Sequence, residues 1–111
     1  MIVKDLLDYL NSNAVGLDAY VEQPENLSGY VIIDQTGSSR RDHIITTTLA
    51  IQSYGDSLYN AMTLNEEVKT AMEGFAELDN VARVELETDY NFTDTTTKQY
   101  RWQAVYQITH Y

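Results

Sequence analysis

The sequence predicts an α+β fold, in which a mostly antiparallel sheet of about four to five strands has two helices packed on one face. Two observations carry this prediction. Apolar residues recur every three or four positions in 2–10 and 56–75, whereas they alternate with polar residues in 82–92 and 100–109. The 111 residues suffice for one core, and no linker or repeat divides them, so we expect a single domain over 1–111.

The first third of the chain predicts one helix and two short strands. The apolar side of the helix consists of Ile2, Val3, Leu6, Leu7 and Leu10, and the Asn-Ser-Asn run at 11–13 offers a stop. A strand over 17–21, a turn at 24–26 and a strand over 30–33 follow. The stretch DQTGSSRRD at 34–42 has the composition of a long loop, after which 42–54 is strand-like again.

The middle of the chain predicts a long helix over 56–75. Asp56 or Ser57 is the expected N-cap, because either side chain can accept a bond from the first backbone amides. Thr63 and Glu66 have the spacing of a second capping box, which would allow a kink near Thr63. We expect Gly74 to end the helix in a left-handed backbone conformation.

The last third predicts a hairpin of two long strands joined by the turn TDTTTK. A register with Tyr90 opposite Tyr100 puts every apolar residue of both strands on one side. The same register sets Asp89 opposite Arg101 as an ion pair. The two helices would cover the apolar side of the sheet, and the other side would be polar and rich in tyrosine.

Composition excludes several classes of function. A formal net charge of −10 argues against binding to nucleic-acid phosphates and to anionic membranes. There is no cysteine, and no apolar run is long enough to span a bilayer or to act as a secretion signal. His43 and His110 lack metal-ligand spacing, and we expect both to be half-exposed residues at strand ends. Phosphate-binding loops and nucleophile elbows are missing from the sequence. We therefore expect no enzyme, no cofactor and no metal; a deep pocket with paired carboxylates would argue for an enzyme instead.

Two groups of charged residues are candidates for contacts between proteins. Arg40 and Arg41 could form forked bonds to carboxylates of another subunit, and Arg101 is a third candidate. The plain alternative for the arginine pair is a solubilising loop. A row of carboxylates, Glu85, Glu87 and Asp89, lies on the expected polar side of the hairpin, where an ordinary solvated face is the alternative.

The order of elements, with LAIQSYGDSLYNAMTLNEEVKTAM at 49–72 and DYNFTDTTTKQYRWQAVYQITHY at 89–111, resembles the small tail terminator proteins of long-tailed bacteriophages. These proteins are also described as tail-completion, minor capsid or head-to-tail joining proteins. The resemblance implies a non-enzymatic, usually hexameric ring that caps the tail tube, stops its growth and meets the head connector. It implies a place in the virion tail, assembled in the host cytoplasm.

In such a ring, DNA passes through the lumen without specific binding, and carboxylates would repel its phosphates. From charge alone, Glu85, Glu87 and Asp89 are the hypothetical lumen residues. A ring also needs two complementary surfaces on each subunit, for which the tyrosine-bearing sheet and the segment with Arg40 and Arg41 are candidates. The alternative function is an acidic inhibitor that mimics DNA and occupies a nucleic-acid-binding protein.

Overall fold

A computed structural model describes residues 1–24 and 29–111. The predicted turn at 24–26 therefore lies outside the described residues at positions 25 and 26. The helices and strands are, in chain order, α1 (Ile2–Leu10), β1 (Ala19–Tyr20), β2 (Tyr30–Arg41), β3 (Ile44–Gly55), α2 (Leu58–Phe75), β4 (Val81–Asn91) and β5 (Tyr100–His110).

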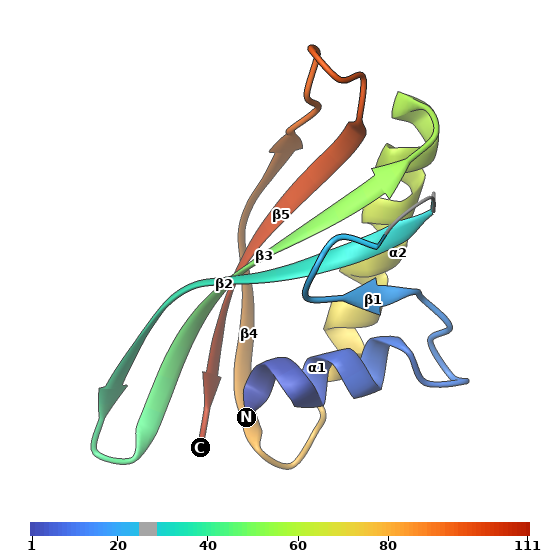
Figure 1. Cartoon of the computed structure of the whole chain (residues 1–111). Helices are drawn as coiled ribbons and strands as arrows, with labels where there is room; N and C mark the ends of the chain where they lie inside the picture. Colours follow the sequence, from blue (N-terminus) through green and yellow to red (C-terminus); the bar gives the residue numbers. More distant parts are fainter. Residues whose placement is uncertain (25–28) are drawn as a thin grey trace.

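The strands form one sheet in the order β1-β2-β3-β5-β4, and both helices lie on the same face of it (Figure 1). The short β1 pairs with β2 in parallel, and the other three pairings are antiparallel. The predicted α+β fold class is thus confirmed. No helix in the described part of the chain is long and apolar enough to cross a membrane.

The core lies between the sheet and the two helices. Leu6 and Leu10 of α1 and Met72 and Phe75 of α2 are almost completely buried there. Burying a side chain of this size stabilises a fold by about 1.5–3 kcal/mol, so this layer supplies much of the stability. The strands contribute alternate residues to it: Val31, Ile33, Leu49, Ile51, Ala104, Tyr106 and Ile108.

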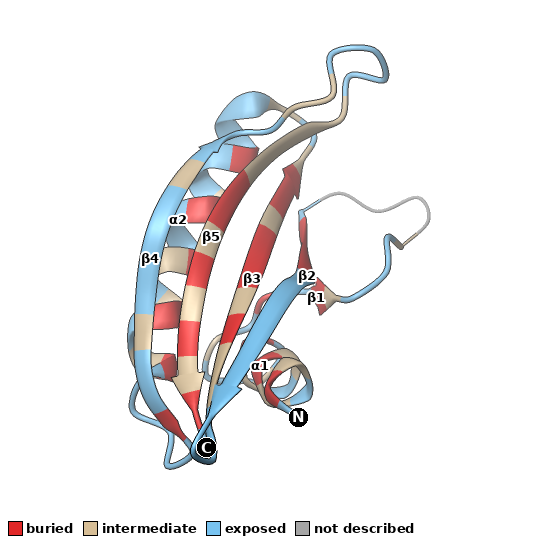
Figure 2. Cartoon of the chain, turned by 90° about the vertical axis from the view of Figure 1, so that its left-hand side faces the viewer, coloured by how far each residue is buried: buried red, intermediate tan, exposed pale blue. Residues whose placement is uncertain are grey.

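No helix of the described residues lies on the opposite side of the sheet, which we call the open face (Figure 2). Side chains alternate across a sheet, so residues paired in register share a face. The open face accordingly holds the intervening residues of the same strands, among them Tyr30, Ile32, Gln52, Tyr54, Tyr90, Arg101 and Gln103.

The predicted loop over 34–42 is wrong, because 34–41 is the second half of β2. This half pairs with the start of β3 and forms an arm that extends beyond the helices (Figure 1). Asp42 and His43 form the two-residue turn at its tip, with φ of 50° and 71°, as a type I′ hairpin turn requires. Thr36 is an extra residue in the pairing and forms a bulge next to Gly37, whereas Ser38 and Ser39 pair regularly with β3.

The predicted hairpin of β4 and β5 is confirmed, but its register is not. Tyr90 lies opposite Gln103, and Leu86 lies opposite Tyr106. Ala82 and Glu87 are extra residues in β4, and each shifts the register by one. Because side chains alternate with a period of two, the bulge at Glu87 exchanges the faces of all residues after it.

The long helix is confirmed with different details at its ends. Ser57 is the N-cap and accepts a bond from the backbone N–H of Asn60. Thr63 donates to the carbonyl of Tyr59 inside an unbroken helix, so the second capping box is wrong. Gly74 does not end the helix in a left-handed conformation, since α2 continues to Phe75 and Ala76 caps it with right-handed backbone angles.

Gly74 serves a close approach of the two helices instead. A Cβ at this position would lie 2.6 Å from the hydroxyl oxygen of Tyr9, which donates to the carbonyl of Ala71 at 2.7 Å. The ring of Tyr9 also lies against Phe75, with centroids 5.4 Å apart. The missing side chain therefore lets α1 dock on α2.

Candidate interaction surfaces

An aromatic series crosses the open face, beginning on the three adjacent strands β1, β2 and β3. The rings of Tyr30 and Tyr54 are stacked with centroids 4.7 Å apart, and Tyr20 meets Tyr30 edge-on at 6.3 Å. Aromatic pairs of these geometries add about 0.5–1.5 kcal/mol each beyond their buried area. Tyr30 and Tyr54 are only 4% and 6% exposed, so this end of the open face is closed to solvent.

Arg101 of β5 continues the series to β4. Its guanidinium carbon lies 5.8 Å from the ring centroid of Tyr54 and 4.4 Å from that of Phe92, which in turn meets Tyr90 edge-on at 6.0 Å. The guanidinium donates to the hydroxyl of Tyr54 at 3.0 Å and to the carbonyl of Phe92 at 2.6 Å. Arg101 of β5 thus connects the aromatic residues of β1, β2 and β3 to those at the end of β4, and it is half-buried among them.

A hydrogen-bonded chain runs alongside the rings. The hydroxyl of Tyr54 donates to Gln52 at 3.1 Å, the amide of Gln52 donates to Gln103 at 2.9 Å, and Gln103 donates to the hydroxyl of Tyr90. Satisfied polar groups of this kind hold each side chain in one position. The open face is therefore ordered before any partner binds, and its exposed aromatic residues are Tyr90 and Phe92.

The predicted ion pair between Asp89 and Arg101 is wrong, because the bulge at Glu87 puts Asp89 on the helix side of the sheet. One carboxylate oxygen of Asp89 accepts bonds from Asn65 at 2.8 Å, Lys69 at 3.1 Å and Trp102 at 3.2 Å. Burial alone would raise the pKa of Asp89, but these three donors outweigh burial and lower the pKa below its usual value. Asp89 therefore fastens β4 to α2.

Glu85 and Glu87 remain together on the open side of β4, and both are exposed. Glu85 forms an ion pair with Arg83, and Glu87 accepts a bond from Gln107 at 2.6 Å. Of the predicted acidic row, these two residues lie on one face and Asp89 lies on the other. A lumen position for Glu85 and Glu87 stays a prediction, whereas Asp89 is already engaged with Lys69 of the same chain.

Arg40 and Arg41 lie at the tip of the arm, and both are exposed to solvent. Arg40 pairs with Ile45 and Arg41 with Ile44, so the two side chains project from opposite faces of the arm. Neither arginine forms an ion pair within residues 1–24 and 29–111. The structure separates them from Arg101, which sits at the other end of the sheet near Tyr54.

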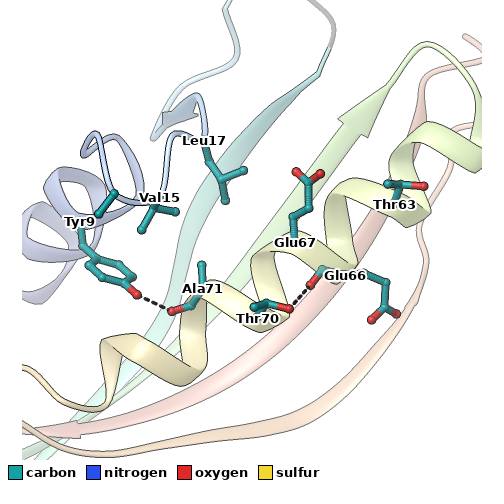
Figure 3. Close-up of a pocket in the computed structure, with 9 residues that line it drawn as sticks. Tyr9, Val15, Leu17, Thr63, Glu66, Glu67, Thr70 and Ala71 are labelled. Carbon is teal, nitrogen blue, oxygen red and sulfur yellow. Dashed lines mark hydrogen bonds between the residues drawn. The ribbon is translucent and has the colours of Figure 1, made fainter.

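A groove of about 510 Å³ lies between α2 and the segment that follows α1 (Figure 3). Tyr9, Val15 and Leu17 line one side and Glu66 and Glu67 the other. The two carboxylates point away from each other, and Glu66 pairs with Lys69 at 3.0 Å. Acid–base catalysis by two carboxylates requires them to converge on one substrate, which this arrangement does not provide.

The two histidines occupy different environments. His43 is exposed in the turn of the arm, rather than half-exposed at the start of a strand. His110 is buried, and its Nε2 lies 2.8 Å from the hydroxyl of Thr47 on β3. The interpretation of His110 as half-exposed is therefore wrong, and its role is to join the last residues of β5 to β3.

Sequence reasoning missed Asn65. This residue is 1% exposed, and its amide donates to Asp89, while its side-chain oxygen has no hydrogen-bond partner among the residues that the structure describes. A signal was present, because Asn65 falls on the same stripe of α2 as Ala61, Val68, Met72 and Phe75, at successive spacings of four and three residues.

Comparison with protein-family models and with curated proteins finds no match to this chain.

Proposed function

We propose that the protein is a non-enzymatic structural subunit of a ring that caps the tail tube of a long-tailed phage or prophage. The observation that carries the proposal is the pair of unlike surfaces at the two edges of one sheet. An arm with two exposed arginines lies at one edge, and a strand with two exposed glutamates lies at the other. A closed ring is built from such a pair, because each copy presents a different patch to each neighbour.

The charge of the chain supports the same proposal. A net charge of −10 per copy disfavours chance association, so contacts between copies depend on where the few lysine and arginine side chains lie. A ring of acidic subunits also lets DNA pass without binding it, since phosphates are repelled rather than neutralised. The ring is favoured over a DNA mimic because Asp89 faces α2, which breaks the carboxylate row that a mimic would use.

The proposed partners are further copies of the chain, the tail tube protein and the head connector, in the virion tail assembled in the host cytoplasm. The test is electron microscopy of phage particles that lack this protein. Overlong tails would support a role in ending tail growth, and normal tails without heads would support a role in joining. Normal, infective particles would refute the proposal.

A second arm of the test addresses the arginines. Arg40→Glu with Arg41→Glu should reduce the yield of joined particles, because the arm then repels an acidic neighbour. Lys4→Glu with Lys98→Glu is the matched control, since it makes the same change in net charge at two exposed lysines away from the arm. Equal effects of both variants would show that net charge alone matters.

A further inference from the structure

The outer edge of β2 has free backbone groups along most of its length. β1 pairs only with Val31 and Ile32, so within the described residues no strand neighbours the outer edge from 33 to 41. Every residue of 34–41 is exposed. Unpaired strand edges are templates for pairing with another chain, and native proteins usually protect them with charge. Here the stretch 35–39 carries none.

The direction of each N–H group follows from the pairing. Val31 donates to the carbonyl of Asp18, the residue before β1, at 2.8 Å, so its main-chain groups point outward from β2. The bulge at Thr36 shifts the alternation by one residue. The tight turn at the tip requires Arg41 to bond with Ile44, which leaves Ser38 and Arg40 with outward N–H groups and Ser39 bonded to β3.

The opposite edge of the sheet, formed by β4, is also free among the described strands. Phe92 donates to the carbonyl of Arg101 on β5 at 2.9 Å, so Asn91 and Asp89 point their main-chain groups outward. The bulge at Glu87 shifts the alternation, and Leu86 and Val84 then point outward. The chain thus has two free edges of similar length.

We propose, resting on the ring proposed above, that the arm of β2 pairs with β4 of the neighbouring copy, edge to edge and antiparallel. Three antiparallel pairings separate β2 from β4 within the sheet, so the two strands run in opposite directions. A rotation about an axis parallel to the strands leaves the strand directions unchanged, and it can bring β4 of one copy beside β2 of the next copy. The contact continues one sheet from subunit to subunit.

One register satisfies backbone and charge together. Placing Arg40 opposite the neighbour's Leu86 aligns outward-pointing groups on both strands and places Arg41 opposite Glu85. Arg41 projects from the same face of the sheet as Glu85 and Glu87, whereas Arg40 projects from the other face. Opposite charges directly across two strands are favourable, so Arg41 is the arginine that recognises the neighbour.

Disulfide trapping tests this register, because the chain has no cysteine of its own. Arg41→Cys with Glu85→Cys, oxidised in purified particles, should give a ladder of cross-linked multimers on a denaturing gel. A bond within one chain is excluded, since three strand spacings of about 4.8 Å separate β2 from β4. Arg40→Cys with Glu85→Cys is the matched control and should remain monomeric, because its two side chains lie on opposite faces.

A backbone variant tests edge pairing without changing charge. Ser38→Pro removes an outward N–H that has no partner in the isolated chain, so the fold should persist and ring assembly should fall at least tenfold. Ser39→Pro removes an N–H that bonds to β3 and should instead lower the melting temperature. If Ser38→Pro unfolds the chain, Arg41→Glu combined with Glu85→Arg replaces it, and this pair should restore the assembly that Arg41→Glu alone loses.

The outcomes separate this inference from the proposed function. Infective particles whose Arg41→Cys, Glu85→Cys subunits stay monomeric after oxidation would overturn the edge pairing and leave the ring intact. Failure of the charge exchange to restore assembly would also overturn the pairing. Normal particles without the protein would overturn the ring itself.

Discussion

Replacing Asp89 by alanine tests the claim that this residue anchors β4 to α2. The carboxylate is 26% exposed and accepts bonds from Asn65, Lys69 and Trp102. At about 1 kcal/mol for each donor, Asp89→Ala should lower the free energy of unfolding by about 3 kcal/mol. A chain of this size changes its melting temperature by about 4 °C per kcal/mol, so a fall of about 12 °C is expected.

Urea denaturation followed by circular dichroism measures this change, with an unchanged slope as the sign that the folded state is intact. Glu87→Ala is the control, since replacing this exposed residue two positions before Asp89 should cost no more than about 0.5 kcal/mol. Asp89→Ala and Arg101→Ala should be additive, because the two side chains lie on opposite faces. A cost for Asp89→Ala below about 1 kcal/mol, or strong coupling to Arg101, would refute the bulged register.

Three further predictions concern stability. The lowered pKa of Asp89 gives stability that is present above its unfolded pKa of about 3.8 and is lost as the pH falls through the folded pKa. An acid titration of Asp89→Asn should lack this loss, and an unchanged acid profile would contradict the role of Asp89. Gly74→Ala should be neutral or destabilising in the wild type but stabilising by about 0.5–1 kcal/mol in Tyr9→Phe, because the clash with the hydroxyl is then removed. Thermal melts measure the effect of Gly74→Ala in each background, and an effect of the same sign in both would count against the close approach. Gly55→Ala should cost more than about 2 kcal/mol in a urea titration, since its Cβ would lie 2.6 Å from the backbone nitrogen of Ala61, while Gly37→Ala has open space and should fall within about 1 kcal/mol.

The periodic segments of the sequence predicted the fold class and both helices. A helix or strand that is buried on one side needs apolar residues at a regular spacing, and this spacing is a stronger signal than the secondary-structure propensity of single residues. The arm was missed since its stability comes from pairing with the threonine-rich start of β3, a non-local contact, while Gly37 and the serines suggested a loop. Local composition cannot report a partner strand.

The bulge at Glu87 was missed for a different reason. No glycine or proline marks it, and Tyr90 fits an apolar or a polar face equally well because its ring and hydroxyl differ in polarity. A simple alternation therefore placed Asp89 beside Arg101 and assigned both to the wrong partners. The tyrosine-rich side of the sheet was predicted correctly, but its connection through Arg101 depended on the register.

The side chains that touch in series from Tyr20 to Tyr90 have a mechanical consequence. A force applied at one edge of the sheet is shared by five strands through the rings, the amides and one guanidinium. The strands therefore resist sliding past one another. The β2 residues beyond Asp34 lack this cross-bracing and are exposed, although their partners on β3 are themselves paired with β5 from Ile45 onward. Among the described residues, this stretch of β2 is thus paired on one side only, and it is the part of the sheet that can bend most easily.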